Sequence, residues 1–230
     1  GAKVLTEREV KRVLTRHGEV AGVQCAGNEI QDDLVVLAAG ALETPKLLMP
    51  LGLPTSPLFA DTFATIGGVC RGVEFNEDVP MGAYIPFSEG LLMPHYSRQL
   101  VTLLQGKGQK IGADDILGMM VKIRDDDAGV VGDTVVKEVT ARDAEIIAHG
   151  SSIAGAILEG AGADPWTFVI APLRGPHPGG TARIGVTVDA HLQTAVSGLY
   201  VADASVLPTA PGGPPILTIV ALAKYAARHM

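Results

Sequence analysis

Short apolar runs separated by polar residues and glycines make up the first forty positions. Apolar and polar side chains alternate in residues 9–15, and the pattern resumes in residues 20–24 after a turn at 17–19. Together with the apolar run 2–5, this pattern predicts a small antiparallel meander. Residues 34–39 are apolar without alternation, which is typical of a strand buried on both faces of a parallel or mixed sheet.

Two helices are expected in the first 160 residues. Thr44 suits an N-cap and Pro45 suits the first helical position, so a short helix is predicted to run through Met49. A second helix follows Thr140, because Asp143 stands where a capping box places its acidic residue. Its isoleucines lie near helical spacing, and the glycines at 160 and 162 predict its end.

The segment between these helices contains a predicted β-hairpin. Residues 117–123 are apolar, residues 125–129 form an acidic turn that ends in glycine, and residues 130–139 are again strand-like. A calcium loop is the alternative for the acidic turn, but the ligand spacing of such a loop is missing. We therefore expect a turn whose carboxylates are solvated. Residues 166–173 are also strand-like.

Composition narrows the classes of function. The chain is 47% hydrophobic and 19% charged, so it can bury a core. A net charge of −7 and an aromatic content of 4% argue against a nucleic-acid surface. No apolar run is long enough to span a membrane, and no secretion signal is visible. Cys25 and Cys70 form no disulfide framework, and no metal-ligand spacing occurs, so we expect a cytoplasmic protein without a metal.

Three segments near the C-terminus contain candidates for binding or catalysis. Residues 175–185 form a loop rich in glycine and proline that contains one imidazole. Residues 198–205 read as a buried strand that ends in a carboxylate, as strands do where parallel sheets bind ligands. Residues 216–229 predict a helix with Pro215 in its first turn. Since residues 216–223 are apolar nearly all round, we expect that helix to be buried, with free N–H groups at its start.

In this order and spacing, the segments resemble the C-terminal signature of the glucose–methanol–choline (GMC) oxidoreductases, flavoproteins that oxidise alcohols. The family's His-Pro-x-Gly-Thr run is similar to residues 177–181, and its Leu-Tyr-Val-x-Asp-Ala-Ser run to residues 199–205. Its Pro-Thr and its Leu-Thr-Ile-x-Ala-Leu-Ala run resemble residues 208–209 and 217–223. Residues 35–48 resemble the family's second flavin-contacting strand and the helix after it.

The resemblance implies an α/β (α+β) fold. Residues 1–54 and 175–230 would belong to a partial FAD-binding Rossmann-like domain that lacks its N-terminal βαβ unit. Residues 55–174 would form an inserted antiparallel-sheet substrate domain. The implied cofactor is FAD, and the implied substrate is a small-molecule alcohol that loses a hydride to flavin N5.

The same resemblance implies the site residues. His177 matches the family's catalytic histidine, and an imidazole with its usual pKa near 6.5 suits a general base; the alternative is that His177 only bonds a loop carbonyl. Asp203 would contact the ribityl–pyrophosphate region, although a cap or turn role is the other interpretation, and the amides of Ile216 and Leu217 would face the flavin pyrimidine. The expected cofactor contacts are Ala39, Gly40, Asp203, Ala204, Pro215, Ile216 and Leu217.

Two departures leave an alternative open. The Gly-x-Gly-x-x-Gly fingerprint of the family is absent, so we expect a C-terminal half that an N-terminal FAD-binding segment or chain completes. Pro214 stands where the family usually has Asn or His, which removes the second member of the catalytic pair. A remnant or subunit that does not bind flavin alone is therefore the competing hypothesis. His95 is a further candidate for the substrate side, with a surface-loop role favoured.

Overall fold

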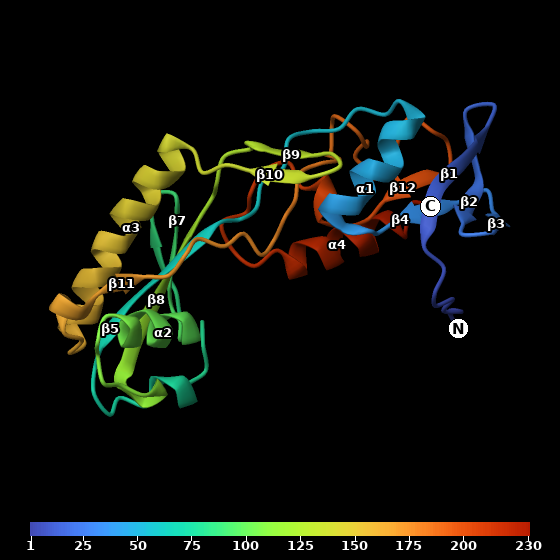
Figure 1. Cartoon of the computed structure of the whole chain (residues 1–230). Coiled ribbons are helices and arrows are strands. Elements are labelled where there is room, and N and C mark those ends of the chain that lie inside the picture. The colour runs from blue at the N-terminus through green and yellow to red at the C-terminus, as the bar shows by residue number, and fades with distance from the viewer.

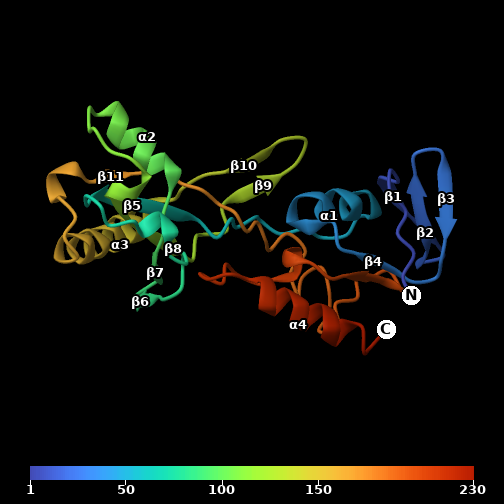
Figure 2. The same cartoon turned by 90° about the horizontal axis from the view of Figure 1, so that it is seen from below.

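The chain folds into two lobes joined by a narrower middle (Figure 1). A computed structural model describes all residues, 1–230. The terminal lobe holds both chain ends and the elements β1–β4, α1, β12 and α4, whereas the sheet lobe holds a five-stranded sheet with α2 and α3. The view from below shows the same separation (Figure 2).

The terminal lobe begins with a three-stranded antiparallel sheet. Its strands are β1 (Val10–Arg16), β2 (Glu19–Cys25) and β3 (Asn28–Gln31). The turn between β1 and β2 has positive φ at His17 (54°) and Gly18 (85°), as a two-residue hairpin turn requires. The meander is confirmed, but residues 2–5 form no strand, and β3 is its third member.

A short parallel pair forms the centre of the terminal lobe. Strand β4 (Val35–Leu37) pairs with β12 (Leu199–Val201), which lies more than 160 positions later in the sequence. Strand β12 is buried throughout, as predicted. The expectation that β4 is buried on both faces is wrong, because Val36 is 39% exposed. Only one strand neighbours β4, so the outer face that carries Val36 is covered only in part.

Helix α1 (Gly40–Leu48) starts four residues before the predicted N-cap Thr44, so Pro45 lies inside the helix. A proline there cannot donate to the carbonyl four residues earlier, that of Ala41. The hydroxyl of Thr181 donates to this carbonyl oxygen instead, at 2.8 Å. The helix therefore tolerates Pro45 because a distant loop provides the missing donor. A single 3₁₀ turn, η1 (Met49–Leu51), follows.

The sheet lobe is an antiparallel sheet with one helix on each face. Its strand order is β11 (Val169–Ile170), β5 (Phe63–Val69), β8 (Ile116–Ile123), β7 (Gly90–Pro94) and β6 (Ile85–Phe87). Helix α3 (Ala141–Gly160) packs on the face that carries Ile66 and Val121. Helix α2 (Arg98–Gly106) packs on the other face, where Gly67 leaves room for Leu100. The capping box at Thr140 and Asp143 is confirmed.

The predicted hairpin between residues 117 and 139 is wrong in its pairing. Strand β8 lies between β5 and β7, whereas β9 (Gly129–Val131) and β10 (Val135–Lys137) pair with each other. The β9–β10 hairpin lies between the two lobes (Figure 1). The strand expected at 166–173 is limited to the two residues of β11.

Helix α4 (Ile216–Ala226) forms where predicted, but it is not buried. Ile219 and Leu222 pack toward Phe59 and Leu207, whereas Leu217 is 83% exposed. The expectation of burial is wrong because nothing in this chain covers the outer side of this apolar helix. None of the helices is long and apolar enough to cross a membrane.

Candidate functional site

The glycine-rich loop around His177 runs alongside residues 59 and 60. Phe59 and Gly179 exchange two backbone hydrogen bonds, and the His177 amide donates to the carbonyl of Ala60 at 3.2 Å. A Cβ atom on Gly179 would clash with the Phe59 ring. The loop therefore needs glycine for its close approach to Phe59, and this approach fixes where His177 lies.

The imidazole of His177 meets a buried ion pair. Its Nδ1 lies 2.9 Å from Asp61 Oδ2, and the same carboxylate oxygen lies 2.6 Å from Lys122 Nζ. The Lys122 ammonium also donates to the carbonyl oxygen of Asp61 at 3.0 Å. The side chain of His177 is 31% exposed, whereas those of Asp61 and Lys122 are 0% and 2% exposed.

Sequence reasoning missed Asp61 and Lys122. A signal for one of them was present, because Lys122 is a charged residue inside the apolar run 117–123. A lysine in such a run is buried only when it has a partner. Nothing local identifies Asp61, which is 61 positions away from Lys122 in the sequence.

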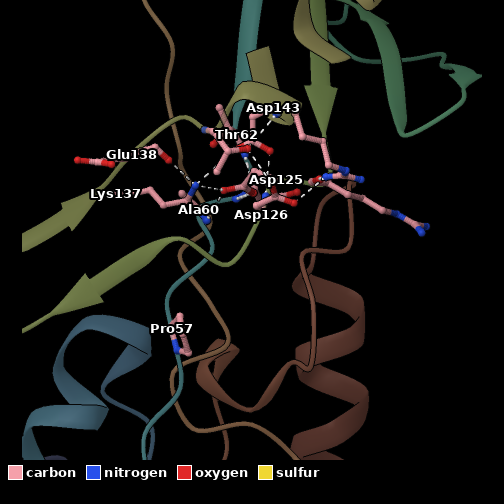
Figure 3. Close-up of polar contacts among 12 residues, drawn as sticks. Pro57, Ala60, Thr62, Asp125, Asp126, Lys137, Glu138 and Asp143 are labelled. Atoms are coloured by element: carbon pink, nitrogen blue, oxygen red, sulfur yellow. Dashed lines mark hydrogen bonds and ion pairs between the residues drawn. The ribbon is translucent and has the colours of Figure 1, made fainter. Parts of the chain in front are cut away.

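The acidic turn is only partly solvated. Asp126 and Asp127 are partly exposed, whereas Asp125 is buried and organises the backbone around it (Figure 3). Its carboxylate accepts hydrogen bonds from the amides of Ala60, Asp61 and Thr62, at 3.0, 2.7 and 3.2 Å. Lys137, at the end of β10, lies 3.1 Å from the same carboxylate. Asp125 thus ties the segment before β5 to the β9–β10 hairpin.

Neighbouring polar groups extend this arrangement to α3 (Figure 3). Asp143 accepts from the amide of Asp126, and the Thr140 hydroxyl donates to the Asp126 carboxylate at 2.7 Å. Arg142 forms ion pairs with Asp126 and Glu89, both at 2.9 Å. The turn therefore joins the N-terminus of α3 to the segment that contains Asp61.

Asp203 joins two of the predicted cofactor segments. Its carboxylate accepts from the Gly40 amide at 2.9 Å, the Thr44 hydroxyl at 2.6 Å and the Ser205 amide at 2.8 Å. Its side chain thus acts as a cap and as a crosslink in this chain, and a contact with a cofactor stays a prediction. The next residue, Ala204, accepts through its carbonyl from the Gly180 amide at 3.2 Å, which connects this segment to the His177 loop.

The start of α4 has unpaired amides. The first backbone hydrogen bond into the helix is from Ile219 to Pro215, so the N–H groups of Ile216 and Leu217 have no partner. Both residues are largely exposed, at 65% and 83%. Gly40, at the start of α1, has a φ of +82° and open space where a Cβ would point. Because the Gly40 amide already donates to Asp203, only the start of α4 offers free N–H groups among these positions.

Two separate cavities flank these residues. One of about 280 Å³ lies beside the His177 loop and is lined in part by Arg174, Gly175 and Pro178. The other, of about 250 Å³, lies beside the entry to α4 and is lined in part by Gly212 and Gly213. They share no lining residue. This chain alone therefore has no single described cavity that both His177 and the start of α4 line.

His95 directly follows β7, in the irregular segment that leads to α2, and it is half-buried there rather than fully exposed. Its ring meets Phe63 edge-on, at 6.3 Å between centroids, and its Nδ1 is buried without a hydrogen-bond partner. Burial, and next the charge of Arg174, lower the pKa of His95 below its usual value. Both effects favour the neutral form of the ring.

Comparison with protein families and sequences identifies relatives. The profile of the family described as GMC oxidoreductase matches residues 124–223. An uncharacterized protein of Methanocaldococcus jannaschii is 32% identical over 234 residues, which cover 100% of this chain and 61% of that protein. An uncharacterized GMC-type oxidoreductase of Mycobacterium tuberculosis is 27% identical over 289 residues, covering 97% and 44%. The chain thus spans about half the length of these relatives.

Solved structures share the fold. Pyridoxine 4-oxidase of Mesorbium loti matches with a TM-score of 0.66 and 20% identity, over 96% of this chain and 57% of that one. A variant of Aspergillus oryzae formate oxidase, described for the effect of its mutation on FAD modification, matches with a TM-score of 0.68 and 17% identity, over 96% of this chain and 59% of that one. At these identities the likeness concerns the fold, including its antiparallel sheets.

Proposed function

We propose that this chain, which belongs to the GMC oxidoreductase family and corresponds to its C-terminal part, completes an FAD-dependent enzyme that oxidises an alcohol. The proposal rests on the exposure of the His177 ring and on the contacts of its two nitrogens. Its ring is partly exposed, Nδ1 is bound to Asp61, and Nε2 makes no hydrogen bond. A free ring nitrogen on an anchored imidazole is what a general base needs.

In this proposal His177 accepts the hydroxyl proton of the alcohol at Nε2. Loss of that proton makes the carbon a better hydride donor, because the developing alkoxide pushes electrons toward the C–H bond. The loop 177–180 holds the imidazole in place through Phe59 and Ala60, so little reorganisation accompanies the proton transfer. Pro214 offers no side-chain donor, and His177 is therefore the single acid–base residue that we assign.

The residues expected to hold FAD fit such a group. The amides of Ile216 and Leu217 are free at a helix N-terminus, where partial positive charge favours an electron-rich ligand edge. Gly40 leaves open space, and Asp203 fixes it and the adjoining Ala39 and Ala204. Bound FAD would supply the hydride acceptor, the N5 atom of the flavin.

We infer that different segments of the chain belong to two domains with different roles. Residues 1–54 and 175–230 form part of an FAD-binding Rossmann-like domain, and residues 55–174 form the substrate domain. An N-terminal segment or partner chain supplies the missing βαβ unit. The exposed apolar side of α4 and the exposed Val36 of β4 support this inference, because both surfaces require a cover.

The test uses the chain joined to, or purified with, its natural N-terminal segment. We expect bound flavin with an absorption band in the visible range, and we expect small alcohols added without oxygen to bleach that band. A complex that folds but binds no flavin would favour the alternative, a non-catalytic remnant. Flavin that is bound but bleached by no alcohol would refute the proposed reaction.

A further inference from the structure

Asp61 and Lys122 form a buried ion pair that contacts the imidazole of His177 without being exposed to substrate. The side chains are 0% and 2% exposed, and Lys122 Nζ lies 2.6 Å from Asp61 Oδ2. They come from different places in the fold, because Asp61 precedes β5 and Lys122 lies near the end of β8. Burying two charges costs solvation free energy, so a cluster of this kind needs a reason beyond stability.

The contacts determine which ring nitrogen carries the proton. An ionised carboxylate accepts hydrogen bonds and donates none, and an ammonium donates only. The 2.9 Å contact between His177 Nδ1 and Asp61 Oδ2 is therefore a hydrogen bond only if Nδ1 carries the hydrogen. The contact with Lys122 Nζ is longer, at 3.4 Å, and would require the opposite state of Nδ1. The shorter contact leaves the neutral ring with its lone pair on Nε2.

The backbone that presents Asp61 is fixed in an uncommon conformation. Asp61 has a φ of +56°, in the left-handed region that side chains other than glycine rarely adopt. Asp125 holds this conformation, because its carboxylate accepts from three successive amides at positions 60 to 62. Strain of this kind persists only where surrounding contacts enforce it.

We propose that Asp61, charge-paired with Lys122, is a positioning residue that fixes the tautomer and direction of His177. The proposal rests on the proposed function, in which Nε2 accepts the hydroxyl proton. Lys122 has a distinct part, because it pairs with the Asp61 carboxylate, whose charge is buried. This pairing keeps the carboxylate in place to accept from Nδ1 of His177.

The first test is nitrogen-15 NMR of the histidine rings at alkaline pH, where the imidazoles are neutral. In the wild-type chain we expect His177 with Nδ1 protonated and Nε2 free. In Asp61→Asn/Lys122→Met, which removes both charges together, we expect the ring to shift toward the Nε2-protonated form. The matched control Glu9→Gln/Lys11→Met removes an exposed lysine–carboxylate pair and should leave the His177 signals unchanged.

Protonation of Nε2 in the wild-type chain, or an unchanged tautomer in the Asp61→Asn/Lys122→Met variant, would overturn the proposal. If that variant fails to fold, the wild-type spectrum still decides. The measurement needs neither flavin nor substrate, so it stands even if the proposed reaction fails.

The second test uses the complex of this chain with its N-terminal segment. It compares the rate of flavin reduction between variants. We expect Asp61→Asn/Lys122→Met to slow reduction by about 10²-fold or more, as loss of the correct tautomer does in other histidine-based sites. In a His177→Ala background the same pair of substitutions should change the rate little, because it acts through His177. Equal slowing in both backgrounds would show a merely structural role and refute positioning.

Discussion

Lys122 shows how strongly one residue depends on its partner. Its ammonium is 2% exposed and contacts both the carboxylate and the carbonyl of Asp61. Replacement of Lys122 by Met leaves a buried carboxylate without its cation, and removing one member of such a pair costs about 3–5 kcal/mol. We expect urea unfolding of Lys122→Met to show a loss of that size.

The same argument predicts that stability to urea recovers when Asp61→Asn is added to Lys122→Met, because no uncompensated charge then remains. The exposed Lys11, which pairs with Glu9, provides the control, since Lys11→Met should change stability by less than about 1 kcal/mol. A double variant as unstable as Lys122→Met alone would contradict this account of the pair.

His95 makes a pH-dependent contribution to folding stability. Its sign is opposite to that of a histidine paired with a carboxylate. Burial and Arg174 lower its pKa in the folded protein, so the unfolded chain binds more protons between that lowered pKa and about 6.5. Stability therefore falls as pH drops through this window and recovers as pH rises. We expect His95→Gln to flatten this part of the stability curve, measured by urea unfolding at several pH values. An unchanged slope would refute the role of His95.

At the scale of elements, α1 depends on a hydroxyl from a distant loop. Thr181 is 1% exposed and donates to the Ala41 carbonyl that Pro45 cannot serve. Thr181→Val should therefore cost about 1–3 kcal/mol, the usual penalty for an unsatisfied buried acceptor. The control Thr102→Val should cost less stability, because the hydrogen bond that it removes joins an exposed hydroxyl to the carbonyl of Arg98 in the same helix. Equal stability losses in thermal unfolding would contradict this explanation.

Local signals predicted some elements well and others poorly. Helix α3 could be predicted because its capping box is a local hydrogen-bond pattern around Thr140. The start of α1 could not, since the donor that permits Pro45 inside the helix is 140 positions away. The pairing of β8 was missed for the same reason, because β5 and β7 compete with the adjacent β9 for its edges.

At the scale of the whole molecule, the exposed apolar side of α4 is the clearest difference between prediction and structure. The sequence indicates a buried helix, and Leu217 is nevertheless 83% exposed. A periodic pattern shows that a face needs cover, but it does not show which chain supplies it. Likewise the contact of His177 with Asp61 spans 116 positions, which no local motif reveals.

This exposed face predicts how the chain behaves in isolation. We expect concentration-dependent self-association in analytical ultracentrifugation, because an apolar helix side without cover is an association surface. Leu217→Lys should reduce this association. Trp166→Lys, in the sheet lobe at a residue that is 95% exposed, should not. Association that Trp166→Lys reduces and Leu217→Lys leaves unchanged would place the contact elsewhere.

The central claim, that His177 takes the proton of the alcohol, is tested most directly by single-turnover reduction of the bound flavin. The complex with the N-terminal segment is mixed with alcohol in the absence of oxygen, and the rate constant is followed at the flavin absorption band. His177→Ala should lower that rate constant by about 10²–10⁴-fold, the usual contribution of a general base. His17→Ala, in an exposed hairpin turn, should not change it. A His177→Ala complex that reduces its flavin at the wild-type rate would contradict the claim.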